Sequence, residues 1–135
     1  MLGATYRIVA QNSTGVALAA GDTITIKAKR WKLTSAGARS AEATEATLTA
    51  AGAGNSLASA GFVLGTTQDN STDGYFGVEL KLSVTISTAT PNGYVNFYMQ
   101  TSTDGGTTWP DSGAGELLKS IAFTAVGTKL DSYVY

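Results

Sequence analysis

A strict alternation of apolar and polar residues in the second half of the chain constrains its fold more than any other feature. Between Phe76 and Thr88 the even-numbered positions through Ile86 are all apolar, and the residues between them are polar or glycine. A period of two places successive side chains on opposite faces of a β-strand. The stretch therefore predicts a strand with one face in a core and the other in water.

A second strand is expected directly after this one. Thr90-Pro91-Asn92-Gly93 predicts a hairpin turn, because proline suits the first corner and Asn-Gly accepts positive φ. The return strand is expected over 94–101. Its predicted inner face carries Val95, Phe97 and Met99, and its outer face carries Tyr94, Asn96, Tyr98 and Gln100.

Two more strands are expected near the C-terminus. The first runs over 117–126, with Leu117, Ile121 and Phe123 on one face, and the second runs over 130–135. Gly127-Thr128 between them is short enough for a tight turn. Four strands joined in this way predict a C-terminal antiparallel meander in an all-β fold, either an antiparallel β-sandwich or a jelly-roll-like barrel.

The first half of the chain is less regular. Strands are expected over 6–10 and 22–33, with a turn at 12–15 and a β-bulge near Lys29–Arg30 where the apolar phase slips. Residues 35–61 are rich in Ala, Gly, Ser and Thr, and we expect an extended arm or long loop there, with at most a short helix. The whole of 1–135 is expected to be a single β domain with this flexible, low-complexity segment in it.

The composition argues against several classes of function. Only 14% of the residues are charged and the net charge is −1, so no electrostatic footprint for nucleic acid or for a membrane surface is present. Cysteine and histidine are both absent, which removes thiolate and imidazole metal ligands, the usual general base and every His-based triad. We expect no enzymatic activity, no cofactor and no metal, and synthesis in the cytosol without a signal peptide.

The segment Ser102-Thr103-Asp104-Gly105-Gly106-Thr107-Thr108-Trp109 fits the pattern S-x-D-x-G-x-T-W. Ser and Asp side chains accept hydrogen bonds from turn N–H groups, glycine takes positive φ, and the tryptophan ring folds back on the hairpin. The pattern resembles the Asp-box of sialidases and related β-propellers. In that family the box is structural, and the catalytic arginine cluster has no counterpart among Arg7, Arg30 and Arg39. The expected structural hairpin residues are Ser102, Asp104, Gly106, Thr108 and Trp109.

The longer run from Tyr98 to Asp111 resembles the strand and hairpin of β-sandwich proteins in tailed-phage particles, whose small head-decoration, neck and tail proteins carry a STDGGTTWP-like turn. The resemblance implies a virion protein, and we expect a head decoration or cement subunit bound to the major capsid protein or other virion proteins. A homo-oligomer is expected, with a trimer favoured by symmetry. A neck, tail or fibre subunit is one alternative, and a carbohydrate-binding or host-adhesion module is another.

Other patterns have plainer interpretations. Asp69–Gly74 matches the opening of a calcium loop, but Leu80 stands where the closing glutamate is needed, and an Asx-rich turn is favoured. Asp104, Asp111 and Glu116 could supply a glycosidase-like carboxylate pair, although no pocket is predicted around them. Two Asn-Ser-Thr triplets fit the glycosylation pattern by chance.

Two clusters of surface residues are further candidate sites. Lys27, Lys29, Arg30 and Lys32 surround Trp31, and we expect a solvated strand edge there, with contact to an acidic partner as the alternative. Tyr94, Tyr98 and Trp109 could form a platform that stacks on sugars, whereas packing within the sandwich is the plainer interpretation.

Overall fold

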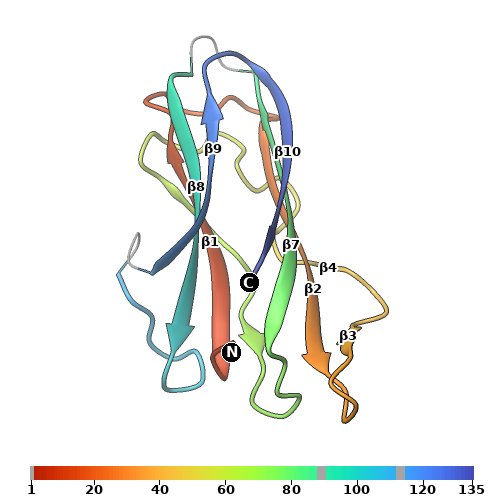
Figure 1. Cartoon of the computed structure of the whole chain (residues 1–135). Coiled ribbons are helices and arrows are strands. Elements are labelled where there is room, and N and C mark those ends of the chain that lie inside the picture. The colour runs from red at the N-terminus through yellow and green to blue at the C-terminus, as the bar shows by residue number, and fades with distance from the viewer. Residues whose placement is uncertain (1, 88–90, 112–114) are drawn as a thin grey trace.

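The computed structural model describes residues 2–87, 91–111 and 115–135, which form two antiparallel sheets packed face to face (Figure 1). Sheet 1 has the order β5-β1-β8-β9, with β6 also paired to β1, and sheet 2 has the order β10-β7-β2-β3, with β4 also paired to β2. The strands are β1 (Thr5–Ser13), β2 (Thr23–Leu33), β3 (Arg39–Ala41), β4 (Ala46–Thr47), β5 (Phe62–Leu64), β6 (Gln68–Asp69), β7 (Gly77–Ile86), β8 (Gly93–Ser102), β9 (Glu116–Phe123) and β10 (Gly127–Val134). The predicted all-β sandwich is confirmed, and the sheets do not close into a jelly-roll-like barrel.

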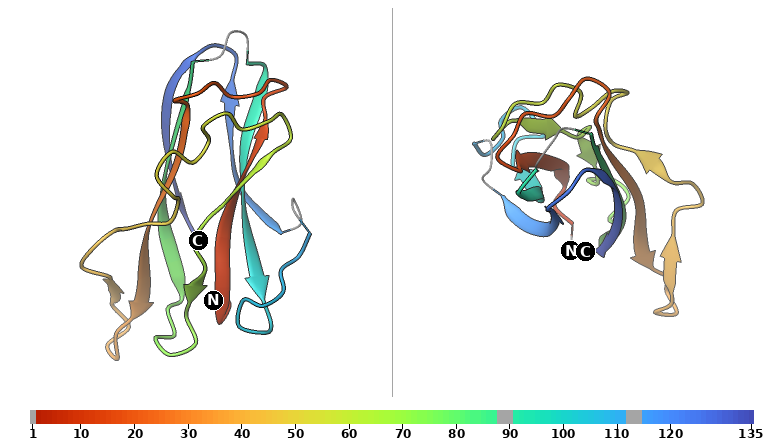
Figure 2. Two further views of the ribbon diagram at one scale, coloured as in Figure 1. Left: turned by 180° about the vertical axis from the view of Figure 1, so that it is seen from behind. Right: turned by 90° about the horizontal axis from the view of Figure 1, so that it is seen from above.

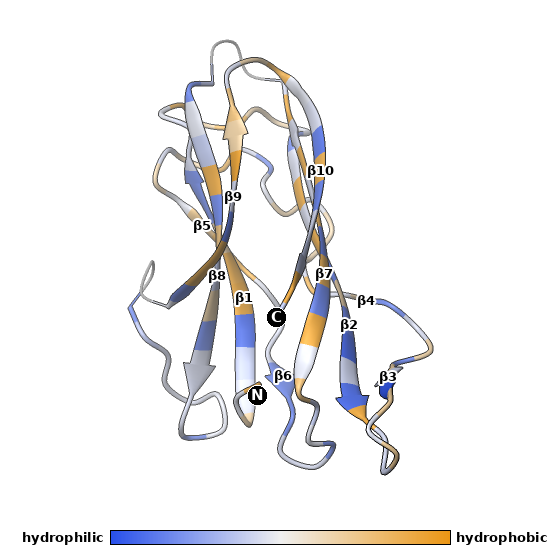
Figure 3. Cartoon of the chain, viewed as in Figure 1, coloured by the Kyte–Doolittle hydropathy of each residue, from blue (hydrophilic) through white to orange (hydrophobic). Residues whose placement is uncertain are grey.

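The alternation in β7 fixes which of its side chains enter the core. All five even-numbered residues of this strand are buried, as predicted, and Figure 3 shows the hydrophobic and hydrophilic positions alternating along it. Phe76 is the exception, because it precedes the strand and is exposed. The alternation therefore predicted the strand correctly, but the strand begins one residue later than predicted and already ends at Ile86.

Strand β2 pairs with β7 in an unbroken register from Thr23 opposite Thr85 to Trp31 opposite Gly77. The predicted bulge near Lys29–Arg30 is therefore wrong. The apolar phase slips because Trp31 lies on the outer face of the sheet, where its ring packs over Gly77. A Cβ atom at Gly77 would lie 2.6 Å from Cζ2 of Trp31, so only glycine leaves room for this ring. Trp31 also stacks on Phe76, with the ring centroids 6.5 Å apart.

Strands β8 and β9 form a hairpin with a bulge in β9. The predicted inner residues Val95, Phe97 and Met99 are buried, as are Ile121 and Phe123. The register shifts between Phe97 and Tyr98, so that Leu118 has no direct partner across the ladder. As a result Leu118 enters the core and Leu117 is exposed, which corrects the predicted position of Leu117.

The predicted C-terminal meander is wrong, because the chain changes sheets twice. β7 belongs to sheet 2, β8 and β9 belong to sheet 1, and β10 returns to sheet 2 beside β7. The segment between β7 and β8, where a hairpin turn was expected at 90–93, therefore joins the two sheets. Residues 88–90 of this segment lie outside the described ones. Pro91 is buried, and Asn92 N donates to Thr14 O. Gly127 and Thr128 belong to β10, and residues 124–126 make the second crossing.

The low-complexity segment 35–61 packs on the sandwich over its second half. It contains β3 and β4, both paired with β2, and no helix is found in it. Leu48 N donates to Ile26 O, and the Leu48 side chain lies in the core with 1% of its surface exposed. Further on, the carbonyl oxygens of Ala53 and Leu57 accept from the amides of Ile24 and Leu18. Seen from above, β3 and β4 flank sheet 2 and extend away from the body (Figure 2).

The core lies between the two sheets and draws on every long strand except β10. Its buried members include Tyr6, Ile8 and Ala10 of β1, Ile24, Ile26 and Ala28 of β2, the even residues of β7 from Val78 to Ile86, Val95, Phe97 and Met99 of β8, and Leu118, Ile121 and Phe123 of β9. The two ends of the chain come together at the start of β7, where Leu2 N donates to Phe76 O, and Tyr135 and Val78 exchange both backbone hydrogen bonds. The termini accordingly lie side by side (Figure 2).

The burial of Leu48 yields a test of the contribution of segment 35–61. Leu48→Ala should lower the free energy of unfolding by about 2–5 kcal/mol, because it removes buried methyl groups and leaves a cavity. Leu33→Ala, at a leucine that is 46% exposed, should change it by less than about 0.5 kcal/mol. Denaturant unfolding followed by tryptophan fluorescence measures both. Equal effects of the two substitutions would contradict the packed position of Leu48.

Candidate functional site

The turn at Ser102–Trp109 follows β8 directly and is held by its own side chains. Ser102 Oγ accepts from Gly106 N at 2.9 Å and donates to Asp104 Oδ1 at 2.7 Å. The Asp104 carboxylate also accepts from the amides of Thr107 and Thr108 and from the Thr108 hydroxyl, the last at 2.6 Å. Gly105 and Gly106 take the positive φ values of 72° and 91° that the turn requires. The bonds accepted by Ser102 and Asp104 and the positive φ of Gly106 are those that the sequence predicts.

The hydrogen bonds of the turn stabilise the ionised form of Asp104. Donation by the Ser102 and Thr108 hydroxyls, followed by the backbone amides, lowers the pKa of Asp104 well below its ordinary value of 3.8. A carboxylic acid with so low a pKa is ionised at neutral pH and has no proton to give. Asp104 therefore cannot act as the general acid of a glycosidase pair.

Trp109 closes the turn and rests on the outer face of sheet 1. Its Nε1 donates to Gly106 O at 3.0 Å, and the guanidinium of Arg7 lies 4.3 Å from the ring centroid. Arg7 Nε in turn donates to Oε1 of the buried Gln100 at 2.9 Å, and Gln100 Nε2 donates to Asp111 O. The indole is thus held between the turn and an arginine of β1, with part of its surface still exposed.

The other carboxylates of this connection lie in the open. Asp111 and Glu116 are both exposed and stand on either side of residues 112–114, which lie outside the described part of the chain. The turn at Ser102–Trp109 is the first part of the longer connection from β8 to β9. Asp104 and Asp111 therefore lie in a surface loop and Glu116 begins β9, and Asp104 already has its partners within the turn.

The two tyrosines of the expected sugar platform lie on the outer face of sheet 1. Tyr94 is 52% exposed, and Tyr98 is half-buried with its hydroxyl donating to Gln11 Oε1 at 3.2 Å. Between them Asn96 joins Ser13 and Ser120 through hydrogen bonds. The three predicted rings lie on the same side of the molecule, but only Tyr94 is largely free.

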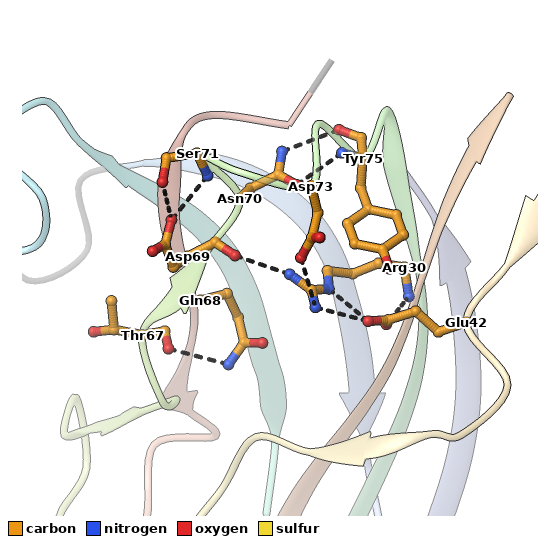
Figure 4. Close-up of polar contacts among 9 residues, drawn as sticks. All are labelled: Arg30, Glu42, Thr67, Gln68, Asp69, Asn70, Ser71, Asp73 and Tyr75. Atoms are coloured by element: carbon orange, nitrogen blue, oxygen red, sulfur yellow. Dashed lines mark hydrogen bonds and ion pairs between the residues drawn. The ribbon is translucent and has the colours of Figure 1, made fainter.

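A second polar cluster, which the sequence did not predict as a unit, forms around Arg30 at one end of the sandwich (Figure 4). Arg30 donates from Nε and Nη2 to Glu42 Oε1 at 3.0 and 2.7 Å, and from Nη1 to Asp69 O at 2.9 Å. Its guanidinium also lies 4.4 Å from the Tyr75 ring centroid. This cluster joins β2, the segment after β3 and the loop before β7.

Hydrogen bonds and charge keep Arg30 and Glu42 ionised against the effect of burial. Both side chains are less than a quarter exposed. The hydrogen bond to Glu42 raises the pKa of Arg30, while burial alone would raise the pKa of Glu42. The hydrogen bonds and charge of Arg30 outweigh that burial, so the pKa of Glu42 is lowered. Tyr6 of β1 lies in the core near this ion pair, and burial raises the pKa of its phenol to about 12.

The calcium-like pattern 69–74 forms the Asx-rich turn favoured by the sequence. Asp69 Oδ1 accepts from Ser71 N and Oγ, and Asn70 Oδ1 accepts from Tyr75 N. The Arg30 guanidinium lies beside Asp69 O and 4.0 Å from Asp73 Oδ2, so a cation of the protein already occupies this position. Within the described residues, no group of three carboxylates is placed to hold a metal ion.

The basic residues of β2 are divided between its two faces and do not line a free edge, because β2 lies between β7 and the short β3 and β4. Arg30 points into the cluster described above, and Lys32 Nζ lies 5.2 Å from the Tyr75 ring centroid. Lys27 lies on the outer face, opposite Lys81 of β7. The expected solvated strand edge is therefore incorrect.

A groove of about 680 Å³ crosses the outer face of sheet 2. Glu45 spans it, with its two carboxylate oxygens 3.7 Å from Lys27 Nζ and 2.6 Å from Lys81 Nζ. Leu130 and Ser132 of β10 line the opposite side. Sequence reasoning missed this feature; the only signal was that Glu42 and Glu45 are the sole acidic residues of segment 35–61.

No protein-family model, curated protein or solved structure matches this chain. Among the described residues there is no helical stretch with the length and hydrophobicity of a membrane span. Function is therefore argued from the residues and their geometry.

The pH dependence of stability tests the assignment of the Asp104 turn. A lowered folded-state pKa means that ionised Asp104 stabilises the fold above pH 3.8, and that this stabilisation is lost as the pH falls below 3.8 through the folded-state pKa. Asp104→Asn should therefore destabilise the protein at pH 7 and change its stability much less at pH 2. Thermal unfolding of both proteins across this range measures the difference. Asp111→Asn, in the same loop, is the control. A difference in stability between the wild type and Asp104→Asn that stays constant with pH would contradict the assignment.

The two Arg–Glu pairs of sheet 2 allow a comparison within one molecule. A double-mutant cycle with Arg30→Met and Glu42→Met should give a coupling energy of about 1–3 kcal/mol, because this pair is largely buried and makes several charged hydrogen bonds. The pair Arg39–Glu79 is exposed, and the same cycle there should give less than about 1 kcal/mol. Denaturant unfolding of the wild type and the six variants measures both. Equal coupling energies for the two pairs would contradict the conclusion that the largely buried Arg30–Glu42 pair stabilises this end of the sandwich.

Proposed function

We propose that this chain is a non-enzymatic structural protein of a phage particle, a head decoration subunit that stabilises the capsid through protein–protein contacts. The observation that carries the proposal is the run Tyr98–Asp111, which resembles the strand and turn of phage virion proteins. In this chain the run forms the end of β8 and a turn closed by Asp104 and Trp109, and it belongs to a β-sandwich. The local structure and the fold therefore both agree with the resemblance.

The character of the surface supports a role in an assembly. Only 14% of the residues are charged, and Thr, Ser, Ala and Gly are plentiful. Such a surface can lie against a neighbouring protein at a small desolvation cost, because few ions must leave water. The proposed partners are the major capsid protein or other virion proteins, in a virion location.

The chemistry of the described residues offers little for catalysis. The chain has no histidine or cysteine, and the Asp104 carboxylate is bound by the donors of its own turn. Asp111 is exposed in the connection after β8, and Glu116 is exposed at the start of β9. A binding or structural role needs no general acid, general base or nucleophile, and we therefore propose no enzymatic activity.

Two other roles share part of this support. A neck, tail or fibre subunit agrees equally well with the Tyr98–Asp111 run. A carbohydrate-binding or adhesion module is supported by the exposed Tyr94, but Trp109 lies against Arg7 and the Tyr98 hydroxyl is bound to Gln11. A platform of three free rings is therefore not formed, and we prefer the structural role.

Particles that lack the chain provide the test. The purified protein should bind to such heads until the sites are saturated, and the loaded heads should release their DNA at a higher temperature. Sedimentation of the mixture and a DNA-dye melting curve measure these two properties. Heads that already carry the protein are the control and should take up none. Binding to isolated tails in place of heads would favour the neck, tail or fibre role, and binding to neither would overturn the proposal.

A further inference from the structure

We propose that two copies of this chain associate through the free edge of β10, in antiparallel orientation and with Leu130 opposite Leu130 of the second copy. The proposal does not depend on the proposed function. It rests on the open edge of β10, on the charges along that edge and on the apolar side chains beside them.

β10 is the longest regular edge among the described strands. It pairs with β7 on one side only, over eight residues and without a bulge. The other edges are less suited to pairing, since β3, β4, β5 and β6 have two or three residues each and β9 is interrupted by its bulge. A long and regular edge strand is the usual site at which a sheet adds another strand.

The backbone of β10 has the correct phase for such an addition. Tyr135 and Val78 exchange both of their hydrogen bonds, so the odd-numbered residues of β10 bond to β7. The even-numbered residues, Leu130 and Ser132 among them, therefore direct their N–H and C=O groups away from β7. In an antiparallel pair centred on Leu130, these even-numbered residues face one another and form the hydrogen-bonded pairs.

The charges on β10 select this register. Centred on Leu130, Lys129 faces Asp131 of the second copy, and the two-fold symmetry produces this contact twice. Centred one residue earlier, Lys129 would face Lys129, and centred one residue later, Asp131 would face Asp131. Opposite charges across a strand pair stabilise it and like charges destabilise it, so the register centred on Leu130 is preferred over both neighbours.

The apolar side chains agree with the same register. Leu130 has 78% of its surface exposed, more than any other large apolar residue described. In the pair it contacts its own copy across the two-fold axis. Val126 and Val134, which are 54% and 57% exposed, face each other on either side. Three contacts between exposed apolar residues are thus formed by one arrangement.

The local hydrogen bonds of Asp131 can be exchanged on pairing. Asp131 Oδ1 accepts from Ser132 N at 2.8 Å, and Oδ2 lies 3.0 Å from Lys119 Nζ. In the pair, Ser132 N donates to Thr128 O of the second copy, which releases Oδ1 for Lys129 of that copy. In a chain without this partner, Lys129 instead donates to Ala122 O of β9, and its charge discourages pairing with unrelated strands.

This contact uses the same surface on both copies, so it produces a two-fold dimer and not the trimer favoured by symmetry alone. Sheet 2 of one copy would continue into sheet 2 of the other. The groove on the outer face, which Leu130 and Ser132 line on one side, would then have a second copy as its neighbour.

Cysteine cross-linking tests the register, because the chain contains no cysteine. Leu130→Cys should form a disulfide-linked dimer under mild oxidation, since directly opposed residues of a hydrogen-bonded pair lie about 5.5 Å apart at Cα. Thr128→Cys, on the same face of the same strand, should stay monomeric on a non-reducing gel, because it faces Ser132 of the other copy. Mixing Thr128→Cys with Ser132→Cys should yield the cross-linked heterodimer. A dimer from Thr128→Cys alone and none from Leu130→Cys would overturn the register.

Solution mass tests the interface without any cross-link. Sedimentation velocity should give the wild-type protein twice the mass of one chain, and Leu130→Glu should halve it, because two carboxylates would meet at the two-fold axis. Leu117→Glu, at an exposed leucine of β9, should leave the dimer intact. Because Leu130 is so exposed, an unchanged circular dichroism spectrum should show that the variant is folded. A wild-type protein that is monomeric at every concentration, or trimeric, would overturn the proposal.

Discussion

The pairing of β2 with β7 is the constraint on which the rest of the structure depends. These two strands form the centre of sheet 2 and keep one register over nine residue pairs, from Thr23–Thr85 to Trp31–Gly77. Because side chains alternate across a strand, a slip of one residue would turn the core residues of β2 toward solvent. The register also decides the surroundings of the polar residues. It directs Arg30 to the inner side, where it meets Glu42, and it places Lys27 and Lys81 together on the outer face, where Glu45 bridges them.

The sequence predicted correctly those features that depend on a pattern within about ten consecutive residues. The alternation in β7 identified its buried side chains, and the Ser102–Trp109 pattern identified which groups accept hydrogen bonds in the turn. In both cases the pattern that decides the outcome lies within one short segment of the chain. The position of Leu118 was missed because two adjacent leucines satisfy the same apolar pattern, and only the bulge opposite Phe97 and Tyr98 decides between them.

The features that the sequence did not predict depend on pairs far apart in the chain. Alternation shows which side chains of a strand are buried, but not which strand lies beside it, so β7 and β8 were expected to pair although they lie in different sheets. The same holds for Arg30, which reads as one of four basic residues on a strand. Its partners, Glu42 and the Asp69 carbonyl, come from segments whose own sequence does not indicate an arginine partner. Trp31 was misread for a related reason, since the glycine that makes room for its ring lies 46 residues later.

A surface with few charges gives each charged side chain a larger share in deciding what it contacts. Most of the cations have a definite partner: Arg30 with Glu42, Arg39 with Glu79, Lys27 and Lys81 with Glu45, and Lys119 with Asp131. Lys129 has no carboxylate partner among the described residues, and its ammonium group meets Ala122 O and the Phe123 ring. It also lies on the longest regular edge of the described strands, two residues from an aspartate. A lysine at a strand edge ordinarily prevents pairing, but an aspartate two residues away makes the edge complementary to itself. The charge that excludes other strands thereby selects a second copy of the same one, which is how a sparsely charged sandwich can be specific in its association.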